Sequence, residues 1–387
     1  MAPDPRVTGH RVERRAFLGS LAAAGWASLA PRAAHAEDVF TVGVVLPADA
    51  EKATELSRGA ALGLDDANAL ATLFGKRLRL ETETERGDGQ AGRALARAGA
   101  LAVVGGVGPG GGEALLQAAT DGATVLNVGA PDDRLRNERC DRRAFHVTPS
   151  VSMYVDALTQ LLIEQRKLTR WAVAGDGSPR GAEIEAAARR SVARRGGTVI
   201  GDTVAADILL LAVDDRGAEA VVARGIAEGR RPDRIAGVGE AGLRLPVERA
   251  GGLWAMGWHH ELERFSAREL NGRFRRRWSA PMSETSWAAW AALKLVGEAV
   301  VRAGAGDGAA LVAFMESAPP FDGHKGDALT FRKWDHQLRQ PLYVAGPRKR
   351  EDIGGQLGPF AVLADVGGKN LDALGTATAE SRCRFAP

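Results

Sequence analysis

Short β-rich runs alternate with amphipathic stretches in the first part of the chain. The hydrophobic pattern predicts strands at 40–46, 77–84, 101–105 and 124–128, and helices at 54–73, 90–98 and 113–119. In the first of these helices, positions 56, 60, 64, 67 and 70 place apolar side chains on one face. Strands that alternate regularly with helices predict a parallel sheet with helices on both faces.

The same pattern then starts again. It predicts helices at 151–165, 181–195 and 218–228, and strands at 170–174, 198–200, 207–213 and 235–238. Beyond these lie an apolar run at 254–258, helices at 266–278 and 284–302, and a β-like region at 329–345. About 350 residues exceed what one hydrophobic core usually holds. The predicted fold class is therefore α/β, with two Rossmann-like lobes built on parallel sheets.

The N-terminus has the pattern of an export signal. Arg14 and Arg15 precede a weakly apolar stretch at 18–30, which ends in the small-x-small site Ala34-His35-Ala36. Paired arginines before a mild apolar segment are typical of twin-arginine export. A membrane anchor would need about 20 apolar residues, and this stretch is shorter. We expect residues 1–36 to be a twin-arginine signal peptide and the mature protein to lie in the periplasm.

Removal of that signal changes the charge of the protein. The whole chain carries +3, and residues 1–36 hold five Arg against one Asp and one Glu, which is also +3. The mature chain is then neutral, with 46 basic (51 minus 5) and 46 acidic (48 minus 2) side chains. A nucleic-acid partner is not expected, because it requires a one-sided basic surface.

The chain has two cysteines, Cys140 and Cys383. An even pair in an oxidising compartment indicates one disulfide, which would anchor a polar C-terminal tail. Two free buried thiols are the alternative.

Ligands of open α/β sheets bind beyond the carboxyl ends of the strands, so the loops there are the candidate site. After the strand at 101–105, Gly106, Gly108 and Gly111 match the GxGxxG dinucleotide fingerprint. The match falls on the third turn between a strand and a helix, and no acidic residue ends the next strand. We therefore interpret the loop as bare backbone that either donates amides to a polar ligand or forms a tight turn.

Carboxylates follow strands of both predicted lobes. They are Asp132, Asp133, Asp214, Asp215 and Glu240, with Arg180 nearby in sequence. Each carboxylate alone could cap a helix. Together they favour an acidic cleft for a cationic solute or, if Asp132, Asp133, Asp214 and Glu240 converge, for a metal ion bound by oxygens.

Other chemistry is sparse. The run Trp258-His259-His260-Glu261 is interpreted as packing between lobes, and Trp287 and Trp290 as core residues on one helix. No nucleophile elbow, zinc-protease motif or CxxC motif occurs in the sequence. The sequence therefore predicts a non-enzymatic binding protein with no cofactor.

The order of these parts resembles the type I periplasmic binding proteins of the leucine/isoleucine/valine-binding kind. The resemblance rests on residues 42–47, 58–68, 103–106, 287–294 and 323–331. It implies three crossings between lobes, near 145–150, 258–261 and 323–326, which form a three-stranded hinge. Lobe one would then hold 37–147 and 259–324, and lobe two 148–258 and 325–365. Residues 366–387 would form a C-terminal tail that returns to bring Cys383 near Cys140.

A narrower resemblance points to the binding component of the ABC system found with PQQ-dependent alcohol dehydrogenases. It is carried by residues 127–136, 140–142, 145–150, 371–375 and 380–385. It implies an inner-membrane ABC permease as partner and a role beside periplasmic alcohol oxidation, together with dehydrogenase components. It does not imply that this chain binds PQQ.

The loops depart from the family pattern at the ligand. Amino-acid binders of the family place Ser or Thr hydroxyls after the third and fourth strands, whereas this chain has Gly108-Pro-Gly-Gly and Ala130-Pro-Asp-Asp there. Glu240 falls where the family keeps an acid for the ligand's ammonium. We therefore expect a small polar or cationic solute other than a branched-chain amino acid. The predicted ligand-binding residues are Gly108, Gly110, Gly111, Ala130, Asp132, Asp133, Arg180, Asp214, Asp215, Glu240 and Trp258.

The predicted mechanism is hinge closure, in which the solute contacts both lobes only when they shut. Three alternatives remain open: an exported oxidoreductase, a sensing or accessory protein of the dehydrogenase without transport, and a binder of a metal ion such as a lanthanide.

Overall fold

The computed structural model describes residues 37–213, 217–241, 251–353, 358–368 and 370–385. The expected signal peptide at 1–36 and the acidic residues Asp214 and Asp215 lie outside these ranges. Among the described residues, no helix combines the length and apolar character needed to cross a bilayer.

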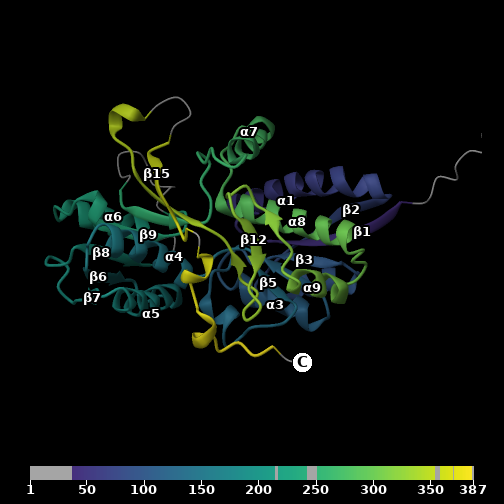
Figure 1. Cartoon of the computed structure of the whole chain (residues 1–387), viewed down its shortest axis with the longest axis horizontal. Helices are drawn as coiled ribbons and strands as arrows, with labels where there is room; N and C mark the ends of the chain where they lie inside the picture. Colours follow the sequence, from purple (N-terminus) through teal and green to yellow (C-terminus); the bar gives the residue numbers. More distant parts are fainter. Residues whose placement is uncertain (1–36, 214–216, 242–250, 354–357, 369, 386–387) are drawn as a thin grey trace, which may run out of the picture. The chain divides into compact units, whose positions relative to one another are not determined.

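The first sheet is parallel and has the strand order β2-β1-β3-β4-β5. Its strands are β1 (Asp38–Leu46), β2 (Lys76–Thr84), β3 (Ala102–Gly105), β4 (Thr124–Asn127) and β5 (Ala144–His146). The helices α1 (Ala50–Ala71), α2 (Gln90–Arg97) and α3 (Gly111–Thr120) connect the first four strands (Figure 1). The predicted parallel sheet is confirmed, and β5 is a short strand that the sequence pattern did not reveal.

The second sheet has the order β15-β14-β10-β9-β8-β6-β7. Five strands run parallel: β6 (Arg170–Gly175), β7 (Thr198–Val199), β8 (Ile208–Ala212), β9 (Ile235–Val238) and β10 (Leu253–Met256). The helices α4 (Val151–Thr159), α5 (Pro179–Arg194) and α6 (Ala218–Ala227) belong to this part of the chain. Two antiparallel strands, β14 (Leu342–Pro347) and β15 (Phe360–Val366), complete one edge. The predicted α/β class with parallel-sheet lobes is confirmed.

The helices α7 (Ala267–Trp278), α8 (Glu284–Arg302) and α9 (Gly308–Glu316) contribute to the hydrophobic core of the first sheet. The contact between α1 and α8 depends on two glycines, because a Cβ atom at Gly59 would lie 2.1 Å from the Ser286 carbonyl oxygen and one at Gly63 would lie 2.6 Å from that of Trp290. The buried face of α1 is therefore centred on these glycines. The prediction that Leu70 belongs to this face is wrong, since its side chain is 37% exposed.

A small antiparallel sheet of β11 (Phe321–Asp322), β12 (Ala328–Phe331) and β13 (Leu338–Arg339) follows α9. Lys325 lies between its first two strands and is only 3% exposed. Its ammonium donates to the carbonyl of Gly257 and, over 2.6 Å, to the side-chain oxygen of Gln340. The Gln340 amide donates in turn to the Val147 carbonyl over 2.6 Å. One buried cation thus links the three segments where we place the crossings between lobes.

A second buried cation lies beside the first crossing. The guanidinium of Arg136 is 2% exposed and donates to the carbonyls of Ala130, Asp132 and Thr148 at 2.7–3.1 Å and to the Gln337 side chain at 2.5 Å. Burial lowers its pKa to about 10. These bonds fix the loop after β4 to the start of the next segment, which positions the carboxylates of that loop.

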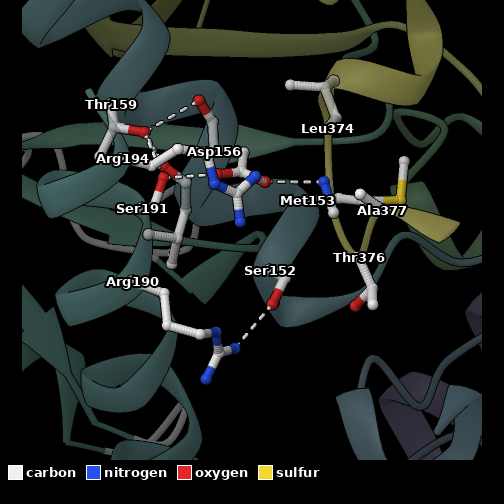
Figure 2. Close-up of polar contacts among 12 residues, drawn as sticks. Ser152, Met153, Asp156, Thr159, Arg190, Ser191, Arg194, Leu374, Thr376 and Ala377 are labelled. Atoms are coloured by element: carbon white, nitrogen blue, oxygen red, sulfur yellow. Dashed lines mark hydrogen bonds and ion pairs between the residues drawn. The ribbon is translucent and has the colours of Figure 1, made fainter. Parts of the chain in front are cut away.

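The C-terminal tail is anchored at both ends. Gly375 donates its amide to Asp156 over 2.7 Å, and Figure 2 shows the neighbouring tail residues Leu374 and Thr376 beside this carboxylate. Asp156 also accepts from Ser191 and from Arg195. Further along, Cys140 and Cys383 are joined by a disulfide with Cα atoms 5.6 Å apart. The tail therefore ties α4, beside the second sheet, to the loop that precedes β5 of the first.

Replacing Cys383 with Ser is expected to lower the free energy of unfolding by about 2–5 kcal/mol, because the unfolded chain is no longer closed across 243 residues. The tail should then exchange its amide hydrogens faster while both sheets keep their protection. Urea denaturation and hydrogen exchange measure the two effects. Arg382→Ala, which removes an exposed ion pair with Glu138, is the matched control and should stay close to the parent. Equal stability of C383S and the parent would contradict the prediction.

Lys325→Met is expected to cost about 3 kcal/mol of stability, because it leaves the buried Gly257 carbonyl and the Gln340 side-chain oxygen without their donor. Burial lowers the pKa of Lys325, so above that pKa the unfolded chain binds more protons than the folded one. The parent's free energy of unfolding should therefore gain a contribution that grows as the pH rises toward about 10.4, the pKa of an unperturbed lysine.

The matched control for this experiment is Lys294→Met, whose ammonium donates to the Asp322 carbonyl at the surface. Denaturation curves recorded from pH 6 upward test the difference. A pH profile of K325M that runs parallel to that of the parent would show that the lysine is not a buried titrating group.

Candidate functional site

The backbone conformation of the loop after β3 accounts for its glycines. Gly108 and Gly110 have φ angles of +89° and +71°, and the amide of Gly111 closes a turn by donating to the Gly108 carbonyl over 3.0 Å. A Cβ atom at Gly112 would lie 2.6 Å from that of Ala130. The loop therefore needs glycine both for its turn and for close packing against the loop after β4. Gly108, Gly110 and Gly111 have a structural reason to be glycine that requires no ligand.

The loop after β4 separates into buried and exposed parts. Ala130 is 3% exposed, and its amide and carbonyl are both hydrogen-bonded to the side chain of Asn127. Its side chain packs in the core, so we remove it from the candidate site. Asp133 accepts from the amide of Ser152 over 3.0 Å and from its hydroxyl over 2.6 Å, and it pairs with Arg190. Asp133 therefore holds the first turn of α4, as a capping carboxylate does.

Two side chains of opposite charge lie on the first turns of α5. Ser178 caps this helix by accepting from the amide of Gly181, and Arg180 and Glu183 follow one turn apart. The Nη1 atom of Arg180 and the Oε2 atom of Glu183 are both shielded from solvent, and each lacks a hydrogen-bond partner in the part of the chain that is described. Arg180 was predicted from the sequence. Glu183 was not, although the spacing of three residues is the signal that would have placed it beside Arg180.

The start of α8 adds a buried acid. Glu284 is 6% exposed and accepts a hydrogen bond from the hydroxyl of Tyr154 on α4, which is itself 3% exposed. Its backbone amide donates to Glu240, in the loop after β9, over 2.6 Å. Gly257 permits this arrangement, because a Cβ atom there would lie 2.5 Å from the Glu284 carboxylate. Burial raises the pKa of both Tyr154 and Glu284.

Acidic residues in the loop after β4 influence the ionisation of the Glu183 carboxyl. Burial is the largest influence on this carboxyl and, with the nearby charges of Asp132 and Asp133, raises its pKa to about 7. The positive charges of Arg180 and Arg134 lower the pKa of Glu183, but by less than burial and the two aspartates raise it. The negative charge of Asp132 thus disfavours ionisation of Glu183.

The aromatic and histidine candidates are core residues. Trp258 is fully buried, stacks on Trp287 with ring centroids 5.6 Å apart, and donates to Asn271 over 3.0 Å. Trp258 therefore has a packing role in the core, and its contact with the ligand stays a prediction. His259 and His260 stack on each other, and burial lowers their pKa values to about 3 and about 4. Within the ranges that the structure covers, no three His, Cys, Asp or Glu side chains are grouped so that they could hold a metal ion.

The side chains that remain come from the ends of strands of both sheets. Asp132 follows β4, Arg180 and Glu183 follow β6, and Glu240 follows β9, with Tyr154 and Glu284 beside them. Of the predicted residues, the structure brings Asp132, Arg180 and Glu240 into this group, and it adds Tyr154, Glu183 and Glu284. The group is rich in carboxylates and holds one unpaired guanidinium nitrogen, so it can bind a small solute through ionic and hydrogen-bonding groups.

Comparison with protein families gives one match, to the family described as periplasmic binding protein, over residues 40–226 and 205–351. A search of curated proteins found no match.

Solved structures share the fold at low sequence identity. A branched-chain amino acid ABC transporter periplasmic ligand-binding protein from Burkholderia xenovorans superposes with a TM-score of 0.76 at 17% identity, over 89% of this chain and 99% of that one. An amino acid ABC transporter substrate-binding protein from Pseudomonas fluorescens gives 0.74 at 16%, over 90% and 100%. A leucine-, isoleucine-, valine-, threonine- and alanine-binding protein from Brucella ovis, in its closed conformation, gives 0.72 at 15%, over 90% and 99%.

The family match covers most of the chain, from residue 40 to residue 351. The chain belongs to the periplasmic binding protein family.

Proposed function

We propose that this protein is the solute-binding component of an ABC importer, and that it takes up a small polar or cationic solute between its two sheets. The proposal is supported by Asp132, Arg180 and Glu240, which follow strands of different sheets. The charge of Arg180 acts on both Glu183 and Tyr154, that of Asp132 acts on Glu183, and that of Glu240 acts on Tyr154. Such side chains can contact one solute together only while the lobes are closed, so binding favours closure.

The Burkholderia, Pseudomonas and Brucella structures are named as transporter or amino-acid-binding proteins, which supports the importer role. A structural neighbour from R. palustris, named as a solute-binding protein, was solved in complex with benzoate, so the fold accommodates ligands other than amino acids. The loops at Gly108–Gly111 and Ala130–Asp133 lack Ser and Thr hydroxyls. We therefore propose a solute other than a branched-chain amino acid.

We further propose that the importer operates beside PQQ-dependent alcohol oxidation. The support is the resemblance carried by residues 127–136 and by the tail stretches 371–375 and 380–385, which contact Asp156 through Gly375 and Cys140 through Cys383. Affinity purification from membranes of the native host tests the partner. Recovery of an inner-membrane permease supports transport, whereas recovery of a dehydrogenase alone favours an accessory role.

Protein taken directly from the periplasm is expected to retain a small solute that native mass spectrometry detects as added mass. The variants Arg180→Gln and Glu240→Gln should lose this mass, because each removes a charged group that contacts the solute. Arg189→Gln is the control, since Arg189 only pairs with Glu185 on the exposed face of α5. Removing the solute should also increase the radius of gyration measured by X-ray scattering. Retention of the solute by both R180Q and E240Q would contradict the proposed site.

Replacing Arg14 and Arg15 with Lys is expected to block export, because the twin-arginine pathway reads this pair. Cell fractionation measures the distribution between cytoplasm and periplasm. The control is Arg6→Lys with Arg11→Lys, which keeps the same charge and leaves the pair intact. Normal periplasmic yield of the paired-Lys variant would exclude the twin-arginine route.

A further inference from the structure

A cavity of about 260 Å³ lies beside Lys325 and shares no lining residue with the candidate site. Segments far apart in the sequence form its walls. They are Phe265 before α7, the turn between β11 and β12, Tyr343 on β14, and the end of β15. The function proposed above makes no use of this cavity.

The wall of the cavity carries a hydroxyl group without a partner. Tyr343 is 4% exposed, and its side-chain oxygen makes no hydrogen bond with any residue that the structure describes. Burial and the negative charges of Asp365 and Asp327 raise the pKa of Tyr343, so the hydroxyl keeps its proton. A buried hydroxyl without a partner costs free energy. Its place on the cavity wall indicates that a polar ligand completes it.

Phe265 contributes an exposed aromatic ring to the cavity. Its side chain is 57% exposed, and Phe265 and Ser266 both have left-handed φ angles, of +54° and +66°. Such angles are costly for a bulky residue and are concentrated at functional sites. The ring packs on Gly326, where a Cβ atom would lie 2.5 Å from the ring atom Cε2. The chain therefore holds this ring at the cavity at a backbone cost and buries little of it.

Two carboxylates give the cavity its charge. Asp327 and Asp365 both line it. Asp327 has no hydrogen bond or ion pair with the other described residues, whereas Asp365 lies 3.8 Å from the exposed guanidinium of Arg264. The charge of Asp327 is thus available to a ligand, and the acids favour a cationic one.

The amino group of Lys325, which also lines the cavity, does not exclude a cation. It donates to the Gly257 carbonyl and to the Gln340 side chain, and burial lowers its pKa to about 7. A cation bound nearby favours the neutral form of this lysine, which limits the repulsion between them. The neutral amine keeps two N–H donors for the same two acceptors.

We propose that this cavity binds a guanidinium group. Phe265 stacks on the flat face of the group, while Asp327 and Asp365 accept hydrogen bonds from its N–H donors. The hydroxyl oxygen of Tyr343 accepts a further N–H donor and so gains the partner that it lacks. The proposal goes beyond the function proposed above and does not depend on it, because the two sites share no residue.

A guanidinium fits these observations better than other ligands. A compact ammonium is strongly hydrated and offers no flat face to an aromatic ring. A metal ion requires several oxygen ligands, and the described residues contain no group of three acidic, histidine or cysteine side chains suited to one. A free anion would be repelled by both aspartates. A neutral polar molecule would leave their charges uncompensated.

A ligand-observed NMR titration of the mature protein compares methylguanidine with methylamine. Methylguanidine is expected to bind with a Kd of about 1 mM, as suits a ligand of few atoms. It should bind at least about tenfold more tightly than methylamine, which cannot stack. It should also raise the melting temperature, because a ligand that binds only the folded state stabilises that state.

Tyr343→Phe should weaken methylguanidine binding about tenfold, because it removes the hydroxyl and keeps the ring. Its free energy of unfolding should equal or exceed that of the parent, since no hydrogen bond within the described chain is lost. Asp327→Asn should weaken binding by a similar factor. Phe265→Gly should do so as well, while it relieves the left-handed backbone. Asp233→Asn, which removes an exposed carboxylate paired with Arg231, is the matched control and should bind like the parent.

Hydrogen exchange with and without methylguanidine locates the bound probe. Slower exchange is expected at 325–328 and 341–343. Protection confined to the loops after β4, β6 and β9 would place the probe in the candidate site and overturn the proposal. Equal affinity for the two probes, absence of methylguanidine binding, or unchanged binding by both Y343F and D327N would overturn it too. The solute retained by protein from the periplasm is measured without the probe, so these failures leave the proposed function standing.

The guanidinium can belong to a free solute or to an arginine side chain of another protein. The tripeptide Gly-Arg-Gly distinguishes the two sources in the same titration. Tighter binding of the tripeptide than of methylguanidine supports the site and assigns it to a protein arginine. Binding of methylguanidine alone supports the site and assigns it to a free solute.

Discussion

The buried ammonium of Lys325 is the interaction on which the architecture depends. Three segments distant in sequence meet at it, through the Gly257 carbonyl, the Gln340 side chain and, beyond that, the Val147 carbonyl. It also lies 3.9 Å from the centroid of the Trp287 ring and near the carboxylate of Glu284. A cation removed from water needs all these partners, because each missing one would leave desolvation uncompensated. These contacts hold the three segments together at Lys325.

Residues that surround Lys325 also position the candidate site. Glu284 links Lys325 to the candidate site, since the charge of Lys325 acts on its carboxylate, which also accepts a hydrogen bond from Tyr154. The Glu284 amide also holds Glu240, which brings the loop after β9 to the start of α8. Beside these buried groups, Arg180 and Glu183 each keep one shielded atom without a hydrogen-bond partner among the described residues.

Much of the fold could be predicted because it depends on local patterns. Alternating apolar runs and amphipathic helices indicated both parallel sheets, and the strand at 40–46 and the helix at 284–302 agree closely with β1 and α8. The antiparallel edge formed by β14 and β15 could not be predicted as such, because strand direction depends on which neighbours pair. Leu70 was misplaced for a related reason, since the buried face of α1 is set by the close approach of Gly59 and Gly63 to α8.

The sequence by itself determined the elements, the two-sheet class and several acids that end strands, because periodicity and loop position are properties of neighbouring residues. Only the tertiary structure decided what those acids contact: Asp133 accepts hydrogen bonds from Ser152 on the first turn of α4, while the charge of Asp132 acts on Glu183. It alone showed Trp258 in the core and Lys325 at the hinge. Burial and pairing arise from contacts between residues far apart in the chain, and no local pattern records them.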